Sequence, residues 1–125
     1  MFKDTKAFSS FSVDDLQKAK EFYGETLGLE FSETPEGLDL NVAGRTRIFV
    51  YPKSNHVPAT FTNLNFPVAN IEESVGNLTK RGVRFEIYKE GDLKTDERGI
   101  FRNNGLKVAW FKDPAGNFLS VVEEK

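Results

Sequence analysis

Ten side chains in this sequence have the types and the spacing to line a pocket for a small molecule. Successive residues of a β-strand point to opposite faces of the sheet, so strand residues of one parity share a face. On that face aromatic rings would offer stacking area, hydroxyls and amides would offer directional hydrogen bonds, and a guanidinium could pair with a carboxylate or phosphate. The candidates are Phe8, Ser10, Arg47, Phe49, Tyr51, Asn63, Asn65, Trp110, Phe118 and Ser120.

The cysteine and histidine content limits the catalytic chemistry. The chain has no cysteine and one histidine, His56. Zero cysteines exclude disulfides, thiolate zinc sites, iron–sulfur ligation and a cysteine nucleophile. His56 lies in the proline-flanked stretch PKSNHVPA, residues 52–59, where a lone histidine is more often an exposed loop residue than a ligand. We predict no catalytic residue, since the sequence offers no Ser-His-Asp arrangement.

The charge pattern argues against nucleic-acid and membrane partners. The 17 basic and 19 acidic residues are interspersed, with a net charge of -2. A nucleic-acid binder or a protein that binds anionic lipid needs a basic patch. No stretch has the roughly 18 consecutive apolar residues of a membrane span. We expect a cytoplasmic protein without either kind of partner.

A repeated pattern of cap, amphipathic helix, glycine and strand predicts how these side chains are positioned. It occurs in DDLQKAKEFYGETLGLEF, residues 14–31, and more weakly in ANIEESVGNLTKRGVRF, residues 69–85. Such self-similarity predicts two copies of one structural unit. The aligned pairs are Phe11 with Phe66, Val13 with Val68, Asp15 with Asn70, Leu16 with Ile71 and, after one deleted residue, Gly28 with Gly82 and Phe31 with Phe85.

The predicted helices have recognisable ends. Asp14, with Gln17 three residues later, is predicted to cap the first helix, and Asn70, with Glu73, the second. Glycines at the two stops, Gly28 and Gly82, are predicted to adopt the left-handed conformation that ends a helix.

The remaining segments are predicted strands. Residues 38–43 and 45–51 flank Gly44 as a hairpin, and residues 106–112 and 117–123 flank the turn DPAG. Each half is therefore predicted to be βαβββ, in an α+β fold. The charged, glycine-rich segment 88–105 is either a mobile loop or a ligand lid. We predict a single domain over residues 1–125, with a first module at about 5–52, a linker at about 53–59 and a second module at about 60–125.

Two stretches carry a resemblance to a known family. FSVDDLQKAKEFYGETLGLEF and VAWFKDPAGNFLSVVEE resemble the signature stretches of the vicinal oxygen chelate superfamily, which includes glyoxalase I, extradiol dioxygenases, and the fosfomycin and bleomycin resistance proteins. The resemblance implies two tandem modules whose curved mixed sheets form a central cleft, usually in a homodimer.

Members of this superfamily that bind a divalent metal ion hold it with histidine, glutamate or glutamine at four inward strand positions. Those positions correspond here to Phe8, Phe49, Asn63 and Ser120. Phenylalanine has no lone pair to donate, and neutral amide and hydroxyl groups are weak ligands. We therefore predict neither a metal ion nor another cofactor.

Three functions remain open. The leading hypothesis is a protein without enzymatic activity, similar to the bleomycin-resistance branch, which sequesters a bulky, partly aromatic small molecule in the metal-free cleft of a dimer. The alternative is a metal-dependent lyase, dioxygenase or thiol transferase in which Glu123 or Glu124, Asp39 and His56 converge on a metal ion. The third is a structural or regulatory module whose cleft is filled by its own side chains. The strand pattern leaves open whether Trp110 or Phe111 faces inward.

Overall fold

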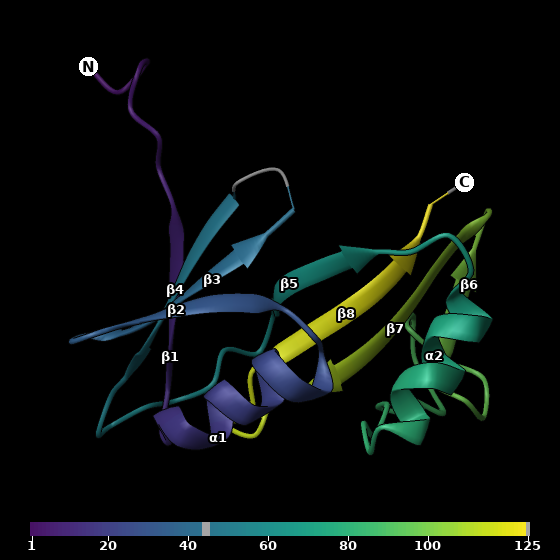
Figure 1. Ribbon diagram of the computed structural model, residues 1–125. Helices are drawn as coiled ribbons and strands as arrows, with labels where there is room; N and C mark the ends of the chain where they lie inside the picture. Colours follow the sequence, from purple (N-terminus) through teal and green to yellow (C-terminus); the bar gives the residue numbers. More distant parts are fainter. Residues whose placement is uncertain (44–45, 125) are drawn as a thin grey trace. The chain divides into compact units, whose positions relative to one another are not determined.

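A computed structural model of the protein, describing residues 1–43 and 46–124, divides the chain into two compact units (Figure 1). The first unit, Met1–Val57, contains β1 (Ser9–Val13), α1 (Leu16–Glu21), the π-helical turn η1 (Phe22–Thr26), β2 (Glu30–Thr34), β3 (Gly37–Val42) and β4 (Thr46–Pro52). The second, Pro58–Lys125, contains β5 (Thr62–Pro67), α2 (Ile71–Lys80), β6 (Ile100–Asn103), β7 (Leu106–Lys112) and β8 (Phe118–Glu123).

Both units have the same strand order. The sheets run β1-β4-β3-β2 and β5-β8-β7-β6, with the first pair of each sheet parallel and the other pairs antiparallel. The predicted α+β class and the duplicated unit are confirmed. The predicted hairpin turn at Gly44 lies outside the described residues.

The first helix begins one residue later than predicted. The side chain of Asp15, not Asp14, accepts a hydrogen bond from the Lys18 amide at 3.1 Å. In α2 the predicted cap is confirmed, because Asn70 Oδ1 accepts from the Glu73 amide at 3.0 Å. Both caps satisfy an amide of the first helical turn that has no partner within the helix. Asp15 and Asn70 are the residues that the repeat alignment pairs.

The predicted stops are also confirmed. Gly28 and Gly82 have φ angles of 73° and 93°, in the left-handed region that a side chain makes unfavourable. Between Glu21 and Gly28 the first helix widens into η1, where the Leu27 amide donates to the Phe22 carbonyl oxygen at 2.9 Å.

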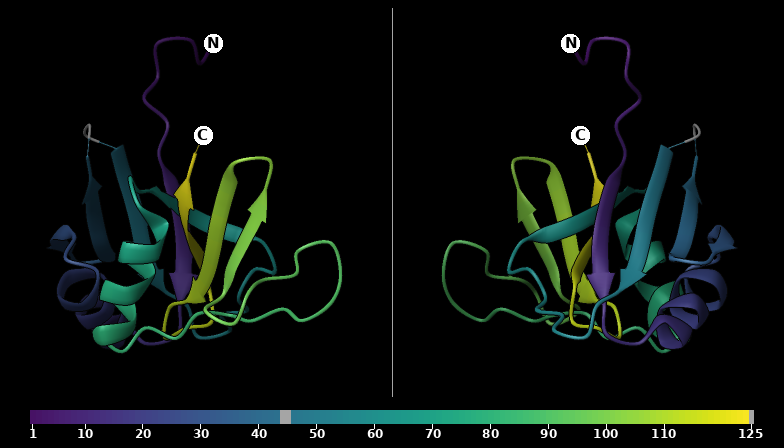
Figure 2. Two further views of the ribbon diagram at one scale, coloured as in Figure 1. Left: turned by 90° about the vertical axis from the view of Figure 1, so that its right-hand side faces the viewer. Right: turned by 90° about the vertical axis from the view of Figure 1, so that its left-hand side faces the viewer.

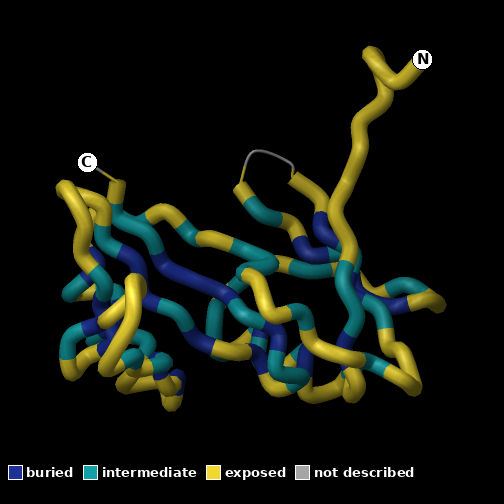
Figure 3. Tube along the Cα trace, turned by 180° about the vertical axis from the view of Figure 1, so that it is seen from behind, coloured by how far each residue is buried: buried dark blue, intermediate teal, exposed yellow. Residues whose placement is uncertain are grey.

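The core of the first unit lies on the helix-facing side of its sheet. Val13, Leu40 and Val50 are fully buried there, and Tyr23 of η1 is buried with them. The Phe11 and Tyr23 ring centroids are 6.0 Å apart, which places Phe11 on this side too. By contrast, the segment before β1 is exposed along its length (Figure 3).

The second unit has its own core, beneath α2. Ile71 and Val75 of this helix are buried, as are Phe111 and Leu119 in register on β7 and β8. Phe85 packs its ring edge-on against Phe111 with centroids 5.4 Å apart. In each unit, therefore, helix covers one face of the sheet, as Figure 2 shows. A ligand could bind on the other face. We call that other face the open face.

The prediction of a strand directly after α2 is wrong. In residues 83–87 the sheet pairing is limited to one isolated bridge, Phe85 to Phe111, in which the Glu86 amide donates to the Trp110 carbonyl oxygen at 2.8 Å. The second strand of this unit is instead β6, which lies inside the segment predicted as a mobile loop or lid. Two segments share the edge of β7. Strand β6 pairs with residues 106–109, and Phe85 forms its bridge to Phe111 further along the same edge.

The turn between β7 and β8 is held by a buried carboxylate. Asp113 Oδ1 accepts from the amides of Ala115 and Asn117 at 3.0 and 2.8 Å, and its Oδ2 accepts from Asn117 Nδ2 at 3.0 Å. These contacts explain the D-P-x-G-N motif as a structural device. It therefore carries information about fold rather than about chemistry.

Asp113→Asn is expected to lower the free energy of unfolding by about 1–2 kcal/mol, because an amide at this position replaces one carboxylate oxygen with a donor that faces the Asn117 amide group. Urea denaturation followed by circular dichroism measures the loss. Asp4→Asn, the same change at an exposed position before β1, is the control and should leave the midpoint unchanged.

Candidate functional site

Five of the predicted site residues belong to the first unit, four of them on or beside β4. In the sheet register Ser10 pairs with Phe49, and Phe49 with Asp39, so these side chains share the open face. The Phe49 and Tyr51 rings stack with centroids 5.9 Å apart and planes inclined by 16°. Both side chains are half-buried, which leaves ring area for a ligand.

Arg47 extends this aromatic layer. Its guanidinium carbon lies 3.9 Å from the centroid of the Phe8 ring and 5.9 Å from that of Phe49. Its Nε also donates to Asp39 Oδ1 at 2.7 Å. The charge of Arg47 is therefore already paired with a carboxylate of the protein. These contacts hold the guanidinium over the Phe8 ring and near the Phe49 ring, where it can interact with aromatic rings as well as form hydrogen bonds.

His56 is not the exposed loop residue that the sequence predicts. It is half-buried, and its Nδ1 lies 2.6 Å from Ser12 Oγ in a hydrogen bond. Ser12 pairs with Tyr51 in the sheet register, so this contact reaches the open face beside the stacked rings. No spacing pattern signals it, because the two residues are 44 positions apart.

In the second unit the open face is set by the register of β5, β8 and β7. Asn65 pairs with Ser120, and Ser120 pairs with Trp110. The fully buried Ser120 hydroxyl donates to Asn65 Oδ1 at 2.6 Å. The same register places Trp110 on the open face and Phe111 in the core, which settles the choice that the sequence left open.

A β-bulge changes the position of Asn63. The register shifts between Thr62 and Leu64, with Thr62 opposite Phe118 and Leu64 opposite Leu119. The regular alternation predicted for Asn63 and Asn65 is thus interrupted, because a bulge inserts an extra residue on one strand. Thr62 and Phe118 together reach the pocket described next.

Two pockets adjoin on the open face of the second unit. The Asn65 pocket has a volume of about 460 Å³, and its lining includes Thr62, Asn65, Pro67, Val108, Trp110 and Val122. The Tyr88 pocket has a volume of about 290 Å³ and is lined by Thr60, Phe61, Thr62, Tyr88, Leu93, Trp110 and Phe118. They share Thr62 and Trp110, so the indole is a wall common to both.

Trp110 is fixed between two other rings. Its centroid lies 6.0 Å from that of Tyr88, nearly edge-on, and 5.9 Å from that of Phe101. Burial, with a smaller contribution from the Glu86 carboxylate, raises the pKa of the Tyr88 hydroxyl above its usual value. Tyr88 is therefore a neutral hydrogen-bond donor at physiological pH, at the rim of an aromatic pocket.

The loop that supplies Tyr88 and Leu93 is closed by two hydrogen bonds between residues 88 and 95. The Thr95 amide donates to the Tyr88 carbonyl at 2.8 Å, and the Tyr88 amide donates to Thr95 Oγ1 at 3.0 Å. The neighbouring Asp96 accepts from the amides of Arg98 and Ile100 and from Arg102 Nη1. Burial works to raise the pKa of the Asp96 carboxyl, but hydrogen bonds from Arg102 and from the two amides outweigh it and lower that pKa.

Sequence reasoning missed Tyr88, Leu93, Thr62 and Phe61 as pocket residues. Tyr88 and Leu93 lie in a segment without periodicity, and Thr62 reaches the pocket only because of the bulge. The signal available in the sequence was an apolar residue among polar neighbours, Phe61 between two threonines and Leu93 in the charged segment 88–105, and the structure shows both side chains exposed.

The four positions at which the superfamily binds metal do not fit a metal ion. Phe8 and Phe49 contact Arg47 through their rings and have no donor atom. The Ser120 hydroxyl is engaged with Asn65. Across residues 1–43 and 46–124, no group of three or more histidine, cysteine, aspartate or glutamate side chains could hold a metal ion.

Three of the four alternative ligands, Asp39, His56 and Glu123, are engaged in other contacts. Asp39 pairs with Arg47, and His56 bonds to Ser12. Glu123 Oε1 accepts from the Ile71 amide at 2.9 Å, while its Oε2 lies 3.6 Å from Lys107 Nζ. Asp39, His56 and Glu123 are thus each held by a contact within the protein.

Comparison with known proteins agrees with the fold. The family model described as bleomycin resistance protein-like N-terminal matches residues 10–40. No curated protein sequence matches the chain. Every helix in the described residues is too short or too polar to span a bilayer.

Several solved structures are similar over nearly the whole chain. A glyoxalase family protein from Enterococcus faecalis is 25% identical with a TM-score of 0.69, covering 98% of this chain and 100% of its own. TnmS3, an antibiotic binding protein from Streptomyces sp. CB03234, is 22% identical with a TM-score of 0.68, covering 98% of each chain. The fosfomycin resistance protein FosX from Listeria monocytogenes is 14% identical with a TM-score of 0.72, covering 98% of this chain and 94% of its own. The resemblance to the vicinal oxygen chelate superfamily is confirmed.

Proposed function

We propose that this protein binds a bulky, partly aromatic small molecule on the open faces of its sheets, without a metal ion and without catalysing a reaction. In this proposal residues 1–125 act as one domain, two chains form a homodimer in the cytoplasm, and binding sequesters the ligand. The candidate contacts are Phe8, Ser10, Arg47, Phe49 and Tyr51 in the first unit. Those in the second unit are Asn63, Asn65, Trp110 and Phe118 together with Tyr88, Leu93, Thr62 and Phe61, while the fully buried Ser120 positions Asn65 through its hydrogen bond.

The observation that supports this proposal best is the pair of pockets that meet at Trp110. Small-molecule sites are concave, largely apolar and furnished with a few polar groups. The Asn65 and Tyr88 pockets have that composition, with aromatic side chains on one side and the Thr62 and Asn65 side chains beside them. Rings held in place by neighbouring rings lose little conformational entropy when they stack on a planar ligand.

The comparisons are consistent with a ligand of this kind. The family model that matches residues 10–40 takes its description from bleomycin resistance protein. TnmS3, with a similar fold, is an antibiotic binding protein. Binding of this type needs no metal ion, since desolvation of a planar ligand between rings supplies the affinity.

Titration of the purified protein with bleomycin and a panel of planar aromatic compounds tests the proposal. Because Trp110 is the single tryptophan, its fluorescence reports directly on the two pockets. We expect a saturable change with at least one compound, and a melting temperature raised by roughly 5–10 °C at a hundredfold excess over the dissociation constant. No response to any compound would count against the proposal.

Elemental analysis separates this function from the metal-dependent alternative. We expect no stoichiometric Zn, Ni, Mn or Fe in the protein as isolated, and ligand binding that is unchanged by a chelator. Bound metal whose removal abolishes turnover of a substrate would establish a lyase, dioxygenase or thiol transferase instead.

A further inference from the structure

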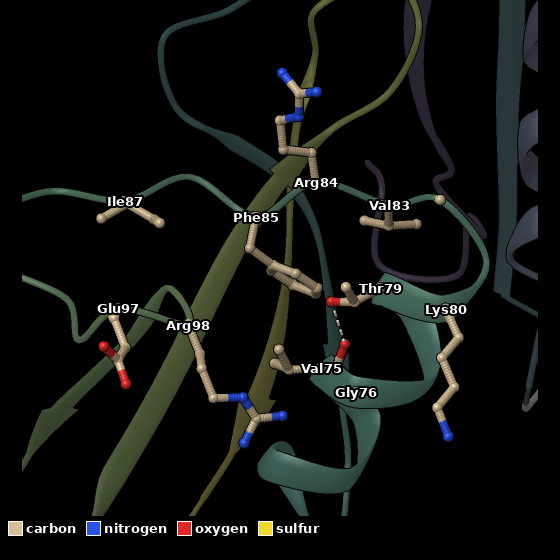
Figure 4. Close-up of a pocket in the computed structure, with 11 residues that line it drawn as sticks. Val75, Gly76, Thr79, Lys80, Val83, Arg84, Phe85, Ile87, Glu97 and Arg98 are labelled. Atoms are coloured by element: carbon tan, nitrogen blue, oxygen red, sulfur yellow. Dashed lines mark hydrogen bonds between the residues drawn. The ribbon is translucent and has the colours of Figure 1, made fainter.

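A groove of about 640 Å³ runs beside α2, between this helix and the segments around residues 83–87 and 97–98 (Figure 4). None of the residues that line it lines the Asn65 or Tyr88 pocket. It is therefore separate from the site proposed above. We call it the α2 groove.

The floor of the α2 groove is apolar. Val75, Val83 and Phe85 are at most 8% exposed, and Figure 4 shows the Phe85 ring pointing toward α2. Thr79 adds no free polar group to the floor, because its hydroxyl donates to the Val75 carbonyl oxygen at 2.7 Å. Gly76 leaves the helix surface open, and a Cβ added there would lie 3.5 Å from Arg98 Nη2.

The rim of the groove is cationic. Lys80, Arg84 and Arg98 line it, with Glu97 as the one acidic side chain. Arg98 is held in position, since its Nη2 donates to the Glu72 carbonyl at 2.8 Å and its amide donates to Asp96 Oδ1 at 2.8 Å. In Figure 4 its side chain extends toward α2.

We propose that the α2 groove binds a small molecule with an apolar body and one carboxylate, of the medium-chain fatty acid type. The apolar body would lie against Val75, Val83 and Phe85. It would cover Ile87, which lines the same groove and is 49% exposed, and so remove apolar surface from water. The carboxylate would pair with the guanidinium of Arg98, the best-anchored cation of the rim. The volume of the groove lies in the usual range for small-molecule sites.

Titration of the full chain with octanoate, followed by nuclear magnetic resonance of the backbone amides, tests this proposal. We expect saturable shifts at residues 75–80, 83–85 and 98, and no shift of the Trp110 indole signal. Two probes divide the ligand into its parts: 1-octanol keeps the apolar body without the charge, and acetate keeps the charge without the body. Each should bind at least roughly fivefold more weakly than octanoate.

Gly76→Leu is the decisive variant. It fills the groove from the helix side while replacing glycine with a stronger helix former, so the protein should fold at least as stably. We expect it to weaken octanoate binding at least roughly tenfold, whereas Asn77→Leu, an exposed position on the same helix, should not. Arg98→Gln should weaken octanoate binding roughly five- to tenfold and leave 1-octanol binding unchanged.

Three results would overturn the proposal: octanoate and 1-octanol binding equally well, octanoate binding to Gly76→Leu as tightly as to the unaltered protein, or amide shifts confined to the open face. Each is independent of the bleomycin titration. Failure of either site therefore leaves the other one testable.

Discussion

Phe111→Ala is expected to lower the free energy of unfolding by about 3–5 kcal/mol, the largest stability effect we predict for a single side chain of this protein. The Phe111 ring is fully buried and packs edge-on against Phe85. Its truncation removes apolar contact area and leaves a cavity between β7 and α2, which the buried neighbours can fill only in part. Since domains of this size are stable by about 5–15 kcal/mol, the loss is a large share of the total.

Chemical denaturation with circular dichroism and fluorescence measures this effect. Phe61→Ala, the same truncation at a side chain that is 69% exposed, should change the free energy by less than about 0.5 kcal/mol. Phe111→Leu should recover most of the loss, because it restores apolar volume. A Phe111→Ala variant as stable as Phe61→Ala would show that Phe111 is not in the core and that the register of β7 is wrong.

Strand alternation predicted the faces of the sheets wherever pairing is regular. Ile48 and Val50 are buried and Phe49 is on the open face, as their parity requires. The rule is reliable because a shift by one residue would expose every apolar side chain of the strand. The alternation rule failed at Asn63, because a bulge adds one residue to the strand there. No residue type in this stretch predicts the bulge.

The helix caps show why local patterns can be off by one position. Asp14 and Asp15 both offer a carboxylate just before the helix, and only the backbone path decides which one reaches an amide of the first turn. The repeat alignment contained the answer, because it pairs Asp15 with the true cap Asn70.

Segment 83–103 was the least predictable part of the fold. Residues 83–87 alternate as a strand should, with Val83 and Phe85 buried, yet they form a single bridge. Residues 100–103 are short and polar on one side, yet they form β6. Competition for the edge of β7 decides between the two, and it is a tertiary effect that neither segment encodes alone.

The part of the candidate site that lies on strands could be predicted from the sequence, and the part that lies on loops could not. Tyr88 and Leu93 come from a loop whose path depends on the bonds between Tyr88 and Thr95, so no periodicity could assign them to the pocket. Trp110 needed the pairing with Ser120 before its side could be decided.

Trp110→Ala is expected to weaken binding of the aromatic ligand roughly 5- to 150-fold, corresponding to the loss of about 1–3 kcal/mol for one stacking side chain. The effect should be large because the indole lines both the Asn65 and the Tyr88 pocket. Its removal also deprives the Tyr88 and Phe101 rings of the neighbour that holds them. Isothermal titration calorimetry replaces fluorescence as the measurement, since the variant has no tryptophan.

Two further variants separate stacking from general loss of structure. Trp110→Phe keeps an aromatic face against Tyr88 and should retain most of the affinity, whereas Trp110→Leu keeps apolar volume without a ring and should not. Phe2→Ala, at an exposed aromatic residue before β1, should bind the ligand like the unaltered protein. If Trp110→Ala and Phe2→Ala bound the ligand equally well, the open face of the second unit could not be where the ligand stacks, and the first unit, with Phe49 and Tyr51, would have to carry the binding.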